Sequence, residues 1–255
     1  MVGTRVIPCL LLCGTRLMKT VKFKDARYLG DPRNAVRIFN DKEVDELVLL
    51  DILATREGKA PVEELIREIV SEAFMPVAYG GGITTLAQAK RIVQLGVEKV
   101  ILCSAAIRDL ELVRQCSADL GAQSVVGCID VNRNMLGKAE VWTHGGTVNT
   151  KQDPVEVAKR LEDSGVGEII VNAIHRDGLM KGYDTALIKS ISSAVTVPVV
   201  ACGGAGSIED FRSAVDAGGA SAVAAGSLFV YQGKFKAVLI NFPTQSELES
   251  VLQTR

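Results

Sequence analysis

Three aspartates stand near the ends of short apolar runs in this 255-residue chain, where acid–base chemistry could take place. Asp130 closes the run 124–131, Asp51 lies near the end of the run 46–52, and Asp177 stands directly before a glycine. A carboxylate at a strand end can act as a general acid or base once it is partly removed from water. We predict Asp130, together with Lys19 and Asp51, as the catalytic residues, with a structural hydrogen bond as the alternative role of Asp130. Asp177 is predicted to position backbone near a phosphate.

Four segments rich in glycine or other small residues follow strand-like runs and form two pairs, 79–82 with 103–106 and 202–206 with 224–227. Backbone amides in such turns can converge on an anion, so two pairs suit a substrate with a phosphate at each end. The alternative is that glycine ends these strands only for steric reasons. The predicted phosphate-binding residues are Gly82, Cys103, Ser104, Asp177, Gly178, Gly203, Gly204, Gly226 and Ser227.

Charged residues begin four of the strand-like runs: Arg5, Glu46, Lys99 and Glu168. Side-chain alternation places Arg5 on the same face of its run as Cys9, which is an interior face if the runs form a barrel. Charge inside a barrel is costly unless it is paired. Two interpretations stay open: a ring of ion pairs that stabilises one end of the barrel, or a polar gate that admits a small molecule.

The elements that must position these residues are eight short apolar runs, which alternate with helical patterns. Such alternation predicts βαβ units and a parallel sheet. Eight units without a linker favour a closed (β/α)8 TIM barrel over an open doubly wound sheet, and active sites of that barrel lie at the carboxyl ends of its strands. The runs are 5–12, 46–52, 76–79, 99–103, 124–131, 168–174, 198–202 and 222–225, and clear helical patterns cover 31–39, 62–73, 84–95 and 154–164.

The chain also repeats itself at about half its length. Pro76-Val-Ala-Tyr-Gly-Gly-Gly corresponds to Pro198-Val-Val-Ala-Cys-Gly-Gly, and residues 5–12 correspond to 124–131. We predict a single (β/α)8 barrel domain over residues 1–255, made of half-barrels at about 1–121 and 122–255. The same repeat matches Asp130 to Leu11, so Asp130 lacks a symmetric carboxylate to share acid–base work.

Two segments are longer than a plain connection. Residues 12–30 carry five basic side chains and predict either a lid over an anionic substrate or a solvated loop. Residues 132–150 alternate around Gly145-Gly146, which predicts a hairpin. His144 is expected in its turn, and His175 is expected to face the barrel mouth, where contact with substrate is left open.

Composition excludes several classes of protein. The net charge of −1 and the 47% hydrophobic content argue against disorder and against a nucleic-acid surface. The apolar runs are too short to cross a membrane, and the N-terminus lacks a long apolar signal stretch. Six cysteines fit no zinc spacing pattern, so we expect free, mostly buried thiols, no metal and no cofactor in a cytoplasmic protein.

Taken in order, several motifs resemble the cyclase subunit of imidazole glycerol phosphate synthase over essentially the whole chain. They include Val6-Ile-Pro-Cys-Leu10, Lys19, Gly30-Asp-Pro32, Leu50-Asp-Ile52, Gly80-Gly-Gly-Ile83, Ile129-Asp130, Arg176-Asp-Gly178, Gly182-Tyr-Asp184 and Gly203-Gly-Ala-Gly206. The resemblance implies that a glutaminase subunit docks on the N-terminal face of the barrel as a heterodimer. It implies that ammonia passes a salt-bridged gate, matched by Arg5, Glu46, Lys99 and Glu168, to a substrate with two phosphates. That substrate is a phosphoribulosyl aminoimidazole carboxamide ribotide.

This sequence departs from the family pattern at its predicted mouth. The family uses two catalytic aspartates, and only one is matched, by Asp130, while Leu11 takes the place of the other. An Asn-Thr pair of the family appears as Cys103-Ser104, and His175 replaces an acidic residue. Leucine cannot transfer a proton, so cyclisation should be severely impaired.

The combination resembles a divergent second copy of the cyclase subunit found with surface-polysaccharide genes. The leading hypothesis is therefore a synthase subunit of a glutamine amidotransferase that delivers nitrogen for an amidine-bearing surface sugar, with a downstream sugar-amidating enzyme as a further partner. One alternative is a working cyclase of histidine biosynthesis in which Asp130, Asp51, Lys19 or bound water compensates for Leu11. The other alternative is a non-catalytic barrel that only activates the glutaminase.

Overall fold

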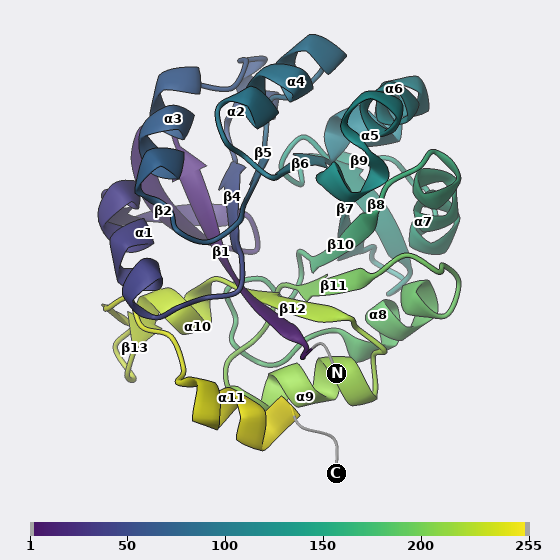
Figure 1. Cartoon of the computed structure of the whole chain (residues 1–255). Coiled ribbons are helices and arrows are strands. Elements are labelled where there is room, and N and C mark those ends of the chain that lie inside the picture. The colour runs from purple at the N-terminus through teal and green to yellow at the C-terminus, as the bar shows by residue number, and fades with distance from the viewer. Residues whose placement is uncertain (1–2, 253–255) are drawn as a thin grey trace.

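Eight parallel strands close into a barrel in the computed structural model, which describes residues 3–252 (Figure 1). Neighbouring strands follow the order β1, β4, β5, β6, β7, β10, β11 and β12, and β12 pairs with β1 to close the ring. The eight strands are β1 (Arg5–Cys13), β4 (Leu47–Asp51), β5 (Val77–Gly80), β6 (Lys99–Leu102), β7 (Val125–Arg133), β10 (Glu168–Ala173), β11 (Val199–Cys202) and β12 (Ala222–Ala225). The predicted (β/α)8 TIM barrel is confirmed.

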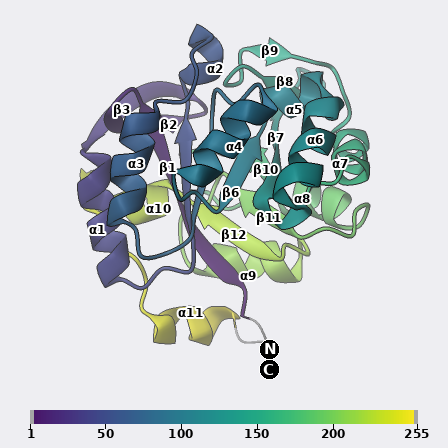
Figure 2. The same ribbon diagram turned by 45° about the horizontal axis from the view of Figure 1, so that its top comes forward.

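Helices follow the strands and cover the outside of the barrel (Figures 1 and 2). The longer ones are α1 (Pro32–Asp41), α3 (Glu63–Glu72), α4 (Leu86–Gln94), α6 (Leu110–Leu120), α7 (Pro154–Asp163), α8 (Thr185–Ser192), α9 (Glu209–Asp216) and α11 (Gln245–Leu252). Short helices lie at α2 (Ala54–Glu57), α5 (Ser104–Arg108) and α10 (Ser227–Val230), and a 3-10 turn covers Ala122–Ser124. Asp31 and Asp153 each accept hydrogen bonds from backbone amides at the start of α1 and α7, because a free first turn needs such acceptors.

Two separate apolar clusters form the core. One lies between the strands and the helices and contains large side chains such as Phe39, Ile66 and Phe211. The other fills the barrel interior with smaller side chains: Ile7, Cys9, Leu11, Val48, Ala78, Ile101, Val126, Cys128, Ile170, Val200, Cys202, Ala222 and Ala224. Because side chains alternate along a strand, residues 5, 7, 9 and 11 of β1 all belong to the inner face.

Three hairpins extend beyond the barrel. Residues 12–30, expected as a lid or loop, form β2 (Arg16–Val21) and β3 (Lys24–Gly30), and β2 pairs antiparallel with β1. The strand β2 was not predicted because its basic residues obscure the pattern of exposure along it. Arg16 is exposed, whereas Leu17 and Lys19 are buried. The hairpin predicted around Gly145-Gly146 is present as β8 (Ala139–Thr143) and β9 (Val148–Asn149). A small hairpin, β13 (Tyr231–Gln232) with β14 (Ala237–Val238), follows α10.

Over residues 3–252, no helix is long and apolar enough to cross a lipid bilayer. The division of the chain into half-barrels near residue 121 stays a prediction. Figure 2 shows the orientation that matters for the site: β8, β9 and α2 gather at the end where the barrel strands finish, which we call the mouth. The opposite end, where the strands begin, is called the base.

Candidate functional site

The base of the barrel holds a closed ring of ion pairs. Arg5 donates to both Glu46 and Glu168. Lys99 donates to the same two carboxylates, with Nζ to oxygen distances of 2.9 Å to Glu46 and 3.1 Å to Glu168. The four residues, called here the charged quartet, begin or directly precede β1, β4, β6 and β10. Each carboxylate therefore bridges two cations across the start of the barrel.

Burial makes this ring electrostatically demanding. Glu46 and Glu168 are 4% and 6% exposed. Partial burial lowers the pKa of Arg5, but its hydrogen bond to Glu168 and the charges of both glutamates outweigh burial and raise that pKa. A buried ion pair is tolerated when each charge has a partner. The structure thus brings all four predicted gate residues together, while their role as an ammonia gate stays a prediction.

The mouth contains a cavity that is lined from most strands of the barrel. Its lining includes the three predicted catalytic residues, Asp130, Lys19 and Asp51, and also Leu11. Leu11 on β1 and Asp130 on β7 stand four strands apart in the ring of eight, which places them on opposite sides of the barrel. The absence of a carboxylate opposite Asp130 is therefore a property of the cavity wall as well as of the sequence.

Asp130 is 8% exposed and has polar neighbours on two strands. Its carboxylate accepts from the amide of Asn172 at 3.3 Å and from the thiol of Cys103 at 3.4 Å. Burial raises the pKa of Asp130 to about 6, and the hydrogen bonds from Cys103 and Asn172 only partly oppose that shift. A carboxyl group with a pKa near neutrality can both hold and release a proton at physiological pH.

Asp177 attaches the β2–β3 hairpin to the mouth. Its carboxylate accepts from Lys19 Nζ at 2.8 Å and from the Thr20 hydroxyl at 3.4 Å. Its backbone carbonyl accepts from the amide of Lys22 at 3.0 Å. Lys19 is 5% exposed, so this pair is shielded from water. The predicted basic segment lies over the cavity through these contacts.

Asp51 has a structural contact as well as a place in the cavity wall. Its Oδ1 accepts from the amides of Leu53 and Ala54, both at 3.0 Å, at the start of α2. Burial raises the pKa of Asp51, and these two amide hydrogen bonds partly oppose the shift. The carboxylate is thus held in a fixed orientation.

The glycine segments line the cavity from two sides. Gly80, Gly81, Cys103 and Ser104 lie at or just after the ends of β5 and β6, while Gly203, Gly204, Gly226 and Ser227 follow β11 and β12. Asp177 and Gly178 line it as well, whereas Gly82 does not. The steric explanation also holds: a Cβ at Gly204 would lie 2.3 Å from the Gly182 carbonyl oxygen. Phosphate binding by these residues stays a prediction.

Two buried polar atoms of the cavity wall lack a hydrogen-bond partner in the described part of the chain. They are Asn172 Oδ1 and Ser227 Oγ, on residues that are 6% and 5% exposed. Buried polar groups are nearly always paired, so such atoms point to a ligand or water that completes them. Sequence reasoning missed Asn172. Its signal was alternation from Glu168 through Ile170 to Asn172, which directs all three to the barrel interior.

His175 does not line the cavity, contrary to the expectation that it faces the mouth. Its Nε2 contacts Asp184 Oδ2 at 3.0 Å, and Arg133 contacts the same oxygen at 2.6 Å. The carboxylate of Asp184 therefore holds the ring outside the cavity lining. His144 lies in the β8–β9 turn with φ of 53°, as expected, and its amide donates to Ser104 Oγ at 2.9 Å.

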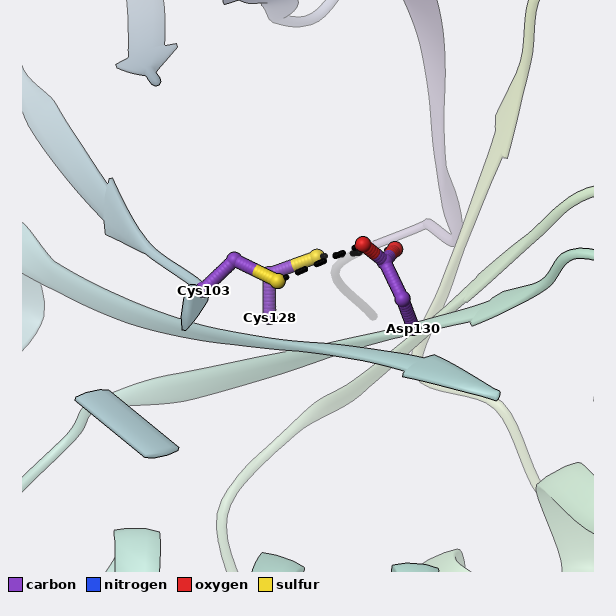
Figure 3. Close-up of side chains that lie close together, drawn as sticks. All are labelled: Cys103, Cys128 and Asp130. Atoms are coloured by element: carbon purple, nitrogen blue, oxygen red, sulfur yellow. Dashed lines mark hydrogen bonds between the residues drawn. The ribbon is translucent and has the colours of Figure 1, made fainter. Parts of the chain in front are cut away.

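Two thiols stand beside Asp130 in the cavity wall (Figure 3). The β6–β7 register pairs Leu102 with Gly127, so the next residues, Cys103 and Cys128, are neighbours. Cys103 Sγ and Cys128 Sγ lie 3.4 and 4.0 Å from oxygens of Asp130. Its contact with Cys103 and then burial hold the pKa of Cys128 well above its ordinary value, so it is a thiol. All six cysteines are free, as expected.

Comparison with known proteins finds relatives over nearly the whole chain. The family described as "Histidine biosynthesis protein" matches residues 5–236. A Pseudomonas aeruginosa protein provisionally named imidazole glycerol phosphate synthase subunit hisF2 is 54% identical over 249 residues, which cover 98% of this chain and 99% of that protein. A Leptospira interrogans protein, provisionally named subunit HisF of the same synthase, is 48% identical over 252 residues, or 98% of this chain and 99% of its own length.

A third relative carries the name without qualification. The imidazole glycerol phosphate synthase subunit HisF of Hyphomonas neptunium is 43% identical over 229 residues, which cover 90% of each chain. A family match over residues 5–236 and identities of this size over nearly the whole length mean that the chain belongs to the histidine biosynthesis protein family, among the HisF cyclase subunits of imidazole glycerol phosphate synthase.

Proposed function

We propose that this chain is the synthase subunit of a glutamine amidotransferase, specialised to deliver ammonia rather than to cyclise a histidine precursor. The observation that carries the proposal is an intact charged quartet at the base combined with Leu11 opposite Asp130 at the mouth. The base keeps what ammonia entry requires, and the mouth lacks half of an acid–base pair. A glutaminase subunit docks on the base and supplies the ammonia.

Ammonia crosses the barrel in three stages. The charged quartet opens by separating one of its cation–carboxylate contacts, and a molecule the size of water passes. Above it lie apolar and thiol side chains of the inner cluster, such as Ile7, Val48 and Ile101. Such a lining favours neutral ammonia, since an ammonium ion would lose its hydration without a partner. The molecule then reaches the cavity beside Asp130.

The mouth binds a phosphorylated ligand. Backbone amides of the two glycine-lined sides, Gly203 with Gly204 and Gly226 on one side, and Ser104 on the other, suit phosphate oxygens. The Ser227 hydroxyl, which has no partner in the described chain, adds a donor. Lys19 supplies positive charge at the closed hairpin, and Gly82, outside the cavity lining, supports the turn.

Leu11 sets the chemistry that this mouth can perform. General acid–base groups typically contribute about 10²–10⁴-fold to a rate, and leucine contributes none. Asp130 and Lys19 leave a residual cyclase activity at most, with Asp51 fixed by its contacts to α2. The ammonia instead serves a separate cytoplasmic enzyme that makes an amidine-bearing surface sugar.

The decisive experiment supplies ammonium and the bis-phosphate ribotide to the purified chain. We expect turnover at least about 100-fold below that of a histidine-pathway cyclase, and a gain of activity in Leu11→Asp. Leu11→Asn, of similar volume but without a titratable group, is the matched control and should stay inactive. Turnover of the unmodified chain at the cyclase rate would favour the working-cyclase alternative and overturn specialisation.

Ammonia delivery is tested separately in the complex with the glutaminase. Glutamine is supplied, and nitrogen from labelled glutamine is traced into free solution and into an acceptor sugar when the downstream enzyme is present. Labelled nitrogen in the amidine at a higher yield than from equimolar external ammonium supports delivery through the barrel. Glutaminase activation without labelled nitrogen reaching any acceptor would support a barrel that only activates its partner.

A further inference from the structure

The wall of the mouth cavity contains two thiols beside Asp130 that acid–base chemistry of this carboxylate alone does not explain. Cys103, Cys128 and Asp130 present two sulfurs and a carboxylate oxygen that all lie within 4.8 Å of one another (Figure 3). Figure 3 shows both thiols directed at the Asp130 carboxylate from neighbouring strands. We propose that these three residues form a zinc site, with a fourth coordination position open to the cavity.

The spacing of the three atoms suits a tetrahedral ion. With zinc–sulfur and zinc–oxygen bonds of about 2.3 and 2.0 Å, ligand atoms of one zinc ion lie roughly 3.5–3.8 Å apart. Here Cys103 Sγ lies 3.4 Å from Asp130 Oδ2 and Cys128 Sγ lies 4.0 Å from Asp130 Oδ1, and one ligand atom from each of the three residues lies within 4.8 Å of the others, so side-chain rotations have only a short way to bring the set to that geometry. The parallel β6–β7 pair holds Cys128 and Asp130 on one strand and Cys103 directly beside them.

The ligand types select the class of metal. Two sulfur ligands favour a thiophilic ion and disfavour magnesium or calcium, which prefer oxygen. An iron–sulfur cluster requires about four cysteine ligands, and the group found among the described residues contains two, Cys103 and Cys128. Three protein ligands with an exposed fourth position are typical of zinc that binds and polarises a small ligand.

Zinc binding leaves the net charge of the three-residue set unchanged. Without metal the set comprises two neutral thiols and one carboxylate, with a charge of −1. Zinc binding releases two thiol protons to solvent and leaves Zn²⁺ with two thiolates and one carboxylate, again with a charge of −1. Because the net charge of this buried wall does not change, the site escapes the large cost of adding an unpaired charge to the interior.

Asn172 provides an independent observation for a ligand at this position. Its amide nitrogen donates to Asp130 Oδ1 at 3.3 Å, which orients the carboxylate. Its own oxygen is buried beside the cavity and has no partner in the described chain. A water molecule bound to the fourth zinc position would donate to this oxygen. Asn172 is thus a positioning residue for the site, as partners of metal ligands usually are.

The experiment measures zinc directly on the full chain, which keeps it separate from any failure of ammonia delivery. Purified reduced protein is stripped with a chelator, loaded with one to three equivalents of Zn²⁺ and dialysed, and the bound zinc is counted by elemental analysis. We expect about one zinc per chain. Replacement by Co²⁺ should give the intense thiolate-to-cobalt absorption that carboxylate or histidine ligands do not produce.

Matched double variants locate the ion. Cys103→Ser with Cys128→Ser should lose the bound zinc and the cobalt absorption, whereas Cys9→Ser with Cys202→Ser, which also line the cavity of the same barrel, should keep both. Asn172→Ala should weaken zinc binding by about 10–100-fold without removing the cobalt absorption. Circular dichroism and thermal unfolding confirm that each variant is folded, and a variant that fails this check is replaced by its single-serine forms.

Two outcomes would overturn the site. One is less than a tenth of an equivalent of zinc on the reduced full chain. If mass spectrometry of the same protein after air oxidation then finds a Cys103–Cys128 disulfide, the pair is a redox couple and not a zinc site. The other is equal zinc content in the full chain and in the Cys103→Ser, Cys128→Ser variant, which would place the metal elsewhere.

Discussion

The base and the mouth of this barrel treat buried polar groups in opposite ways. At the base, each carboxylate of the charged quartet accepts from both cations. At the mouth, Asn172 Oδ1 and Ser227 Oγ have no partner in the described chain, and two thiols face a carboxylate. The contrast teaches that the charged quartet is electrostatically complete within the described chain, whereas the mouth holds buried polar atoms that a ligand or water would have to complete.

The largest expected effect comes from breaking the base. Glu168→Ala leaves Arg5 and Lys99 to share Glu46 alone, and removal of one partner from a buried network typically costs about 3–5 kcal/mol. We therefore expect the free energy of unfolding, measured by urea denaturation, to fall by about 3 kcal/mol.

A surface ion pair provides the control for this change. Glu156 contacts Lys159 at 3.0 Å with a 67% exposed side chain, so Glu156→Ala should change the free energy by less than about 0.5 kcal/mol. Equal losses in the two variants would mean that the charged quartet is not a buried network in solution.

A second effect concerns the ion pair between Lys19 and Asp177 at the mouth. Lys19→Met removes the cation that holds Asp177, which is 9% exposed, and leaves that carboxylate without its charge partner. We expect hydrogen exchange of the β2–β3 amides to speed up by about 30-fold, equivalent to roughly 2 kcal/mol of local opening. Exchange in α7, far along the chain, should stay the same.

Unchanged exchange of the hairpin in Lys19→Met would mean that pairing with β1 alone holds it down. Lys22→Met tests the contribution of charge by itself. The link from residue 22 to Asp177 runs through its backbone amide, so this variant should leave exchange of the hairpin nearly unchanged.

Much of this fold could be predicted because its signals are local. Eight apolar runs alternate with helices, and caps such as Asp31 and Asp153 mark helix starts by their own chemistry. The β2–β3 hairpin escaped prediction because its buried face includes Lys19, whose partner Asp177 lies 158 residues away. A charge that is satisfied so far along the chain has no local signature.

The candidate site divides in the same way. The charged quartet was predictable because its members stand at the starts of strand-like runs, and side-chain alternation places Arg5 on the same interior face as Cys9. The cluster of Cys103, Cys128 and Asp130 was not, since no metal spacing links positions 103 and 128. Only the register between β6 and β7 makes them neighbours, and register is set by the closed barrel rather than by either strand alone.

A third prediction compares pairing at the rim of the mouth with pairing at the base. Hydrogen bonds from His175 and then Arg133 hold the pKa of Asp184 far below its usual range. A depressed carboxyl pKa stabilises the fold above the unfolded pKa of about 3.9 and loses that effect as the pH falls towards the folded pKa. Asp184→Asn keeps an acceptor for the amide of Leu187 but removes the charge.

We expect Asp184→Asn to lower the free energy of unfolding by about 1.5 kcal/mol from pH 8 to pH 5, because Arg133 is 40% exposed and partly screened. The difference from the unmodified chain should shrink below about pH 4. Urea denaturation at pH 7, 5 and 3.5 measures it. A difference that stays constant down to pH 3.5 would assign the effect to packing rather than charge.

The smallest effect on stability is expected where the mouth is incomplete. Ser227 is buried, and its hydroxyl has no partner in the described chain, so Ser227→Ala removes no protein hydrogen bond. The free energy of unfolding should change by less than about 0.5 kcal/mol, because loss of an unpaired buried group offsets the lost contacts.

Binding should respond instead: hydrogen bonds to charged groups contribute about 1.5–3 kcal/mol, so affinity for the bis-phosphate ribotide should fall at least about tenfold. Calorimetric titration measures the affinity, and Ser207→Ala, next to Gly206 but outside the cavity lining, is the control that should leave it unchanged. A Ser227→Ala variant that is less stable by more than about 1 kcal/mol, with unchanged ligand affinity, would show that water already satisfies this hydroxyl in the free protein. The mouth would then be as complete as the base, and the contrast between the two ends would rest on the thiol cluster alone.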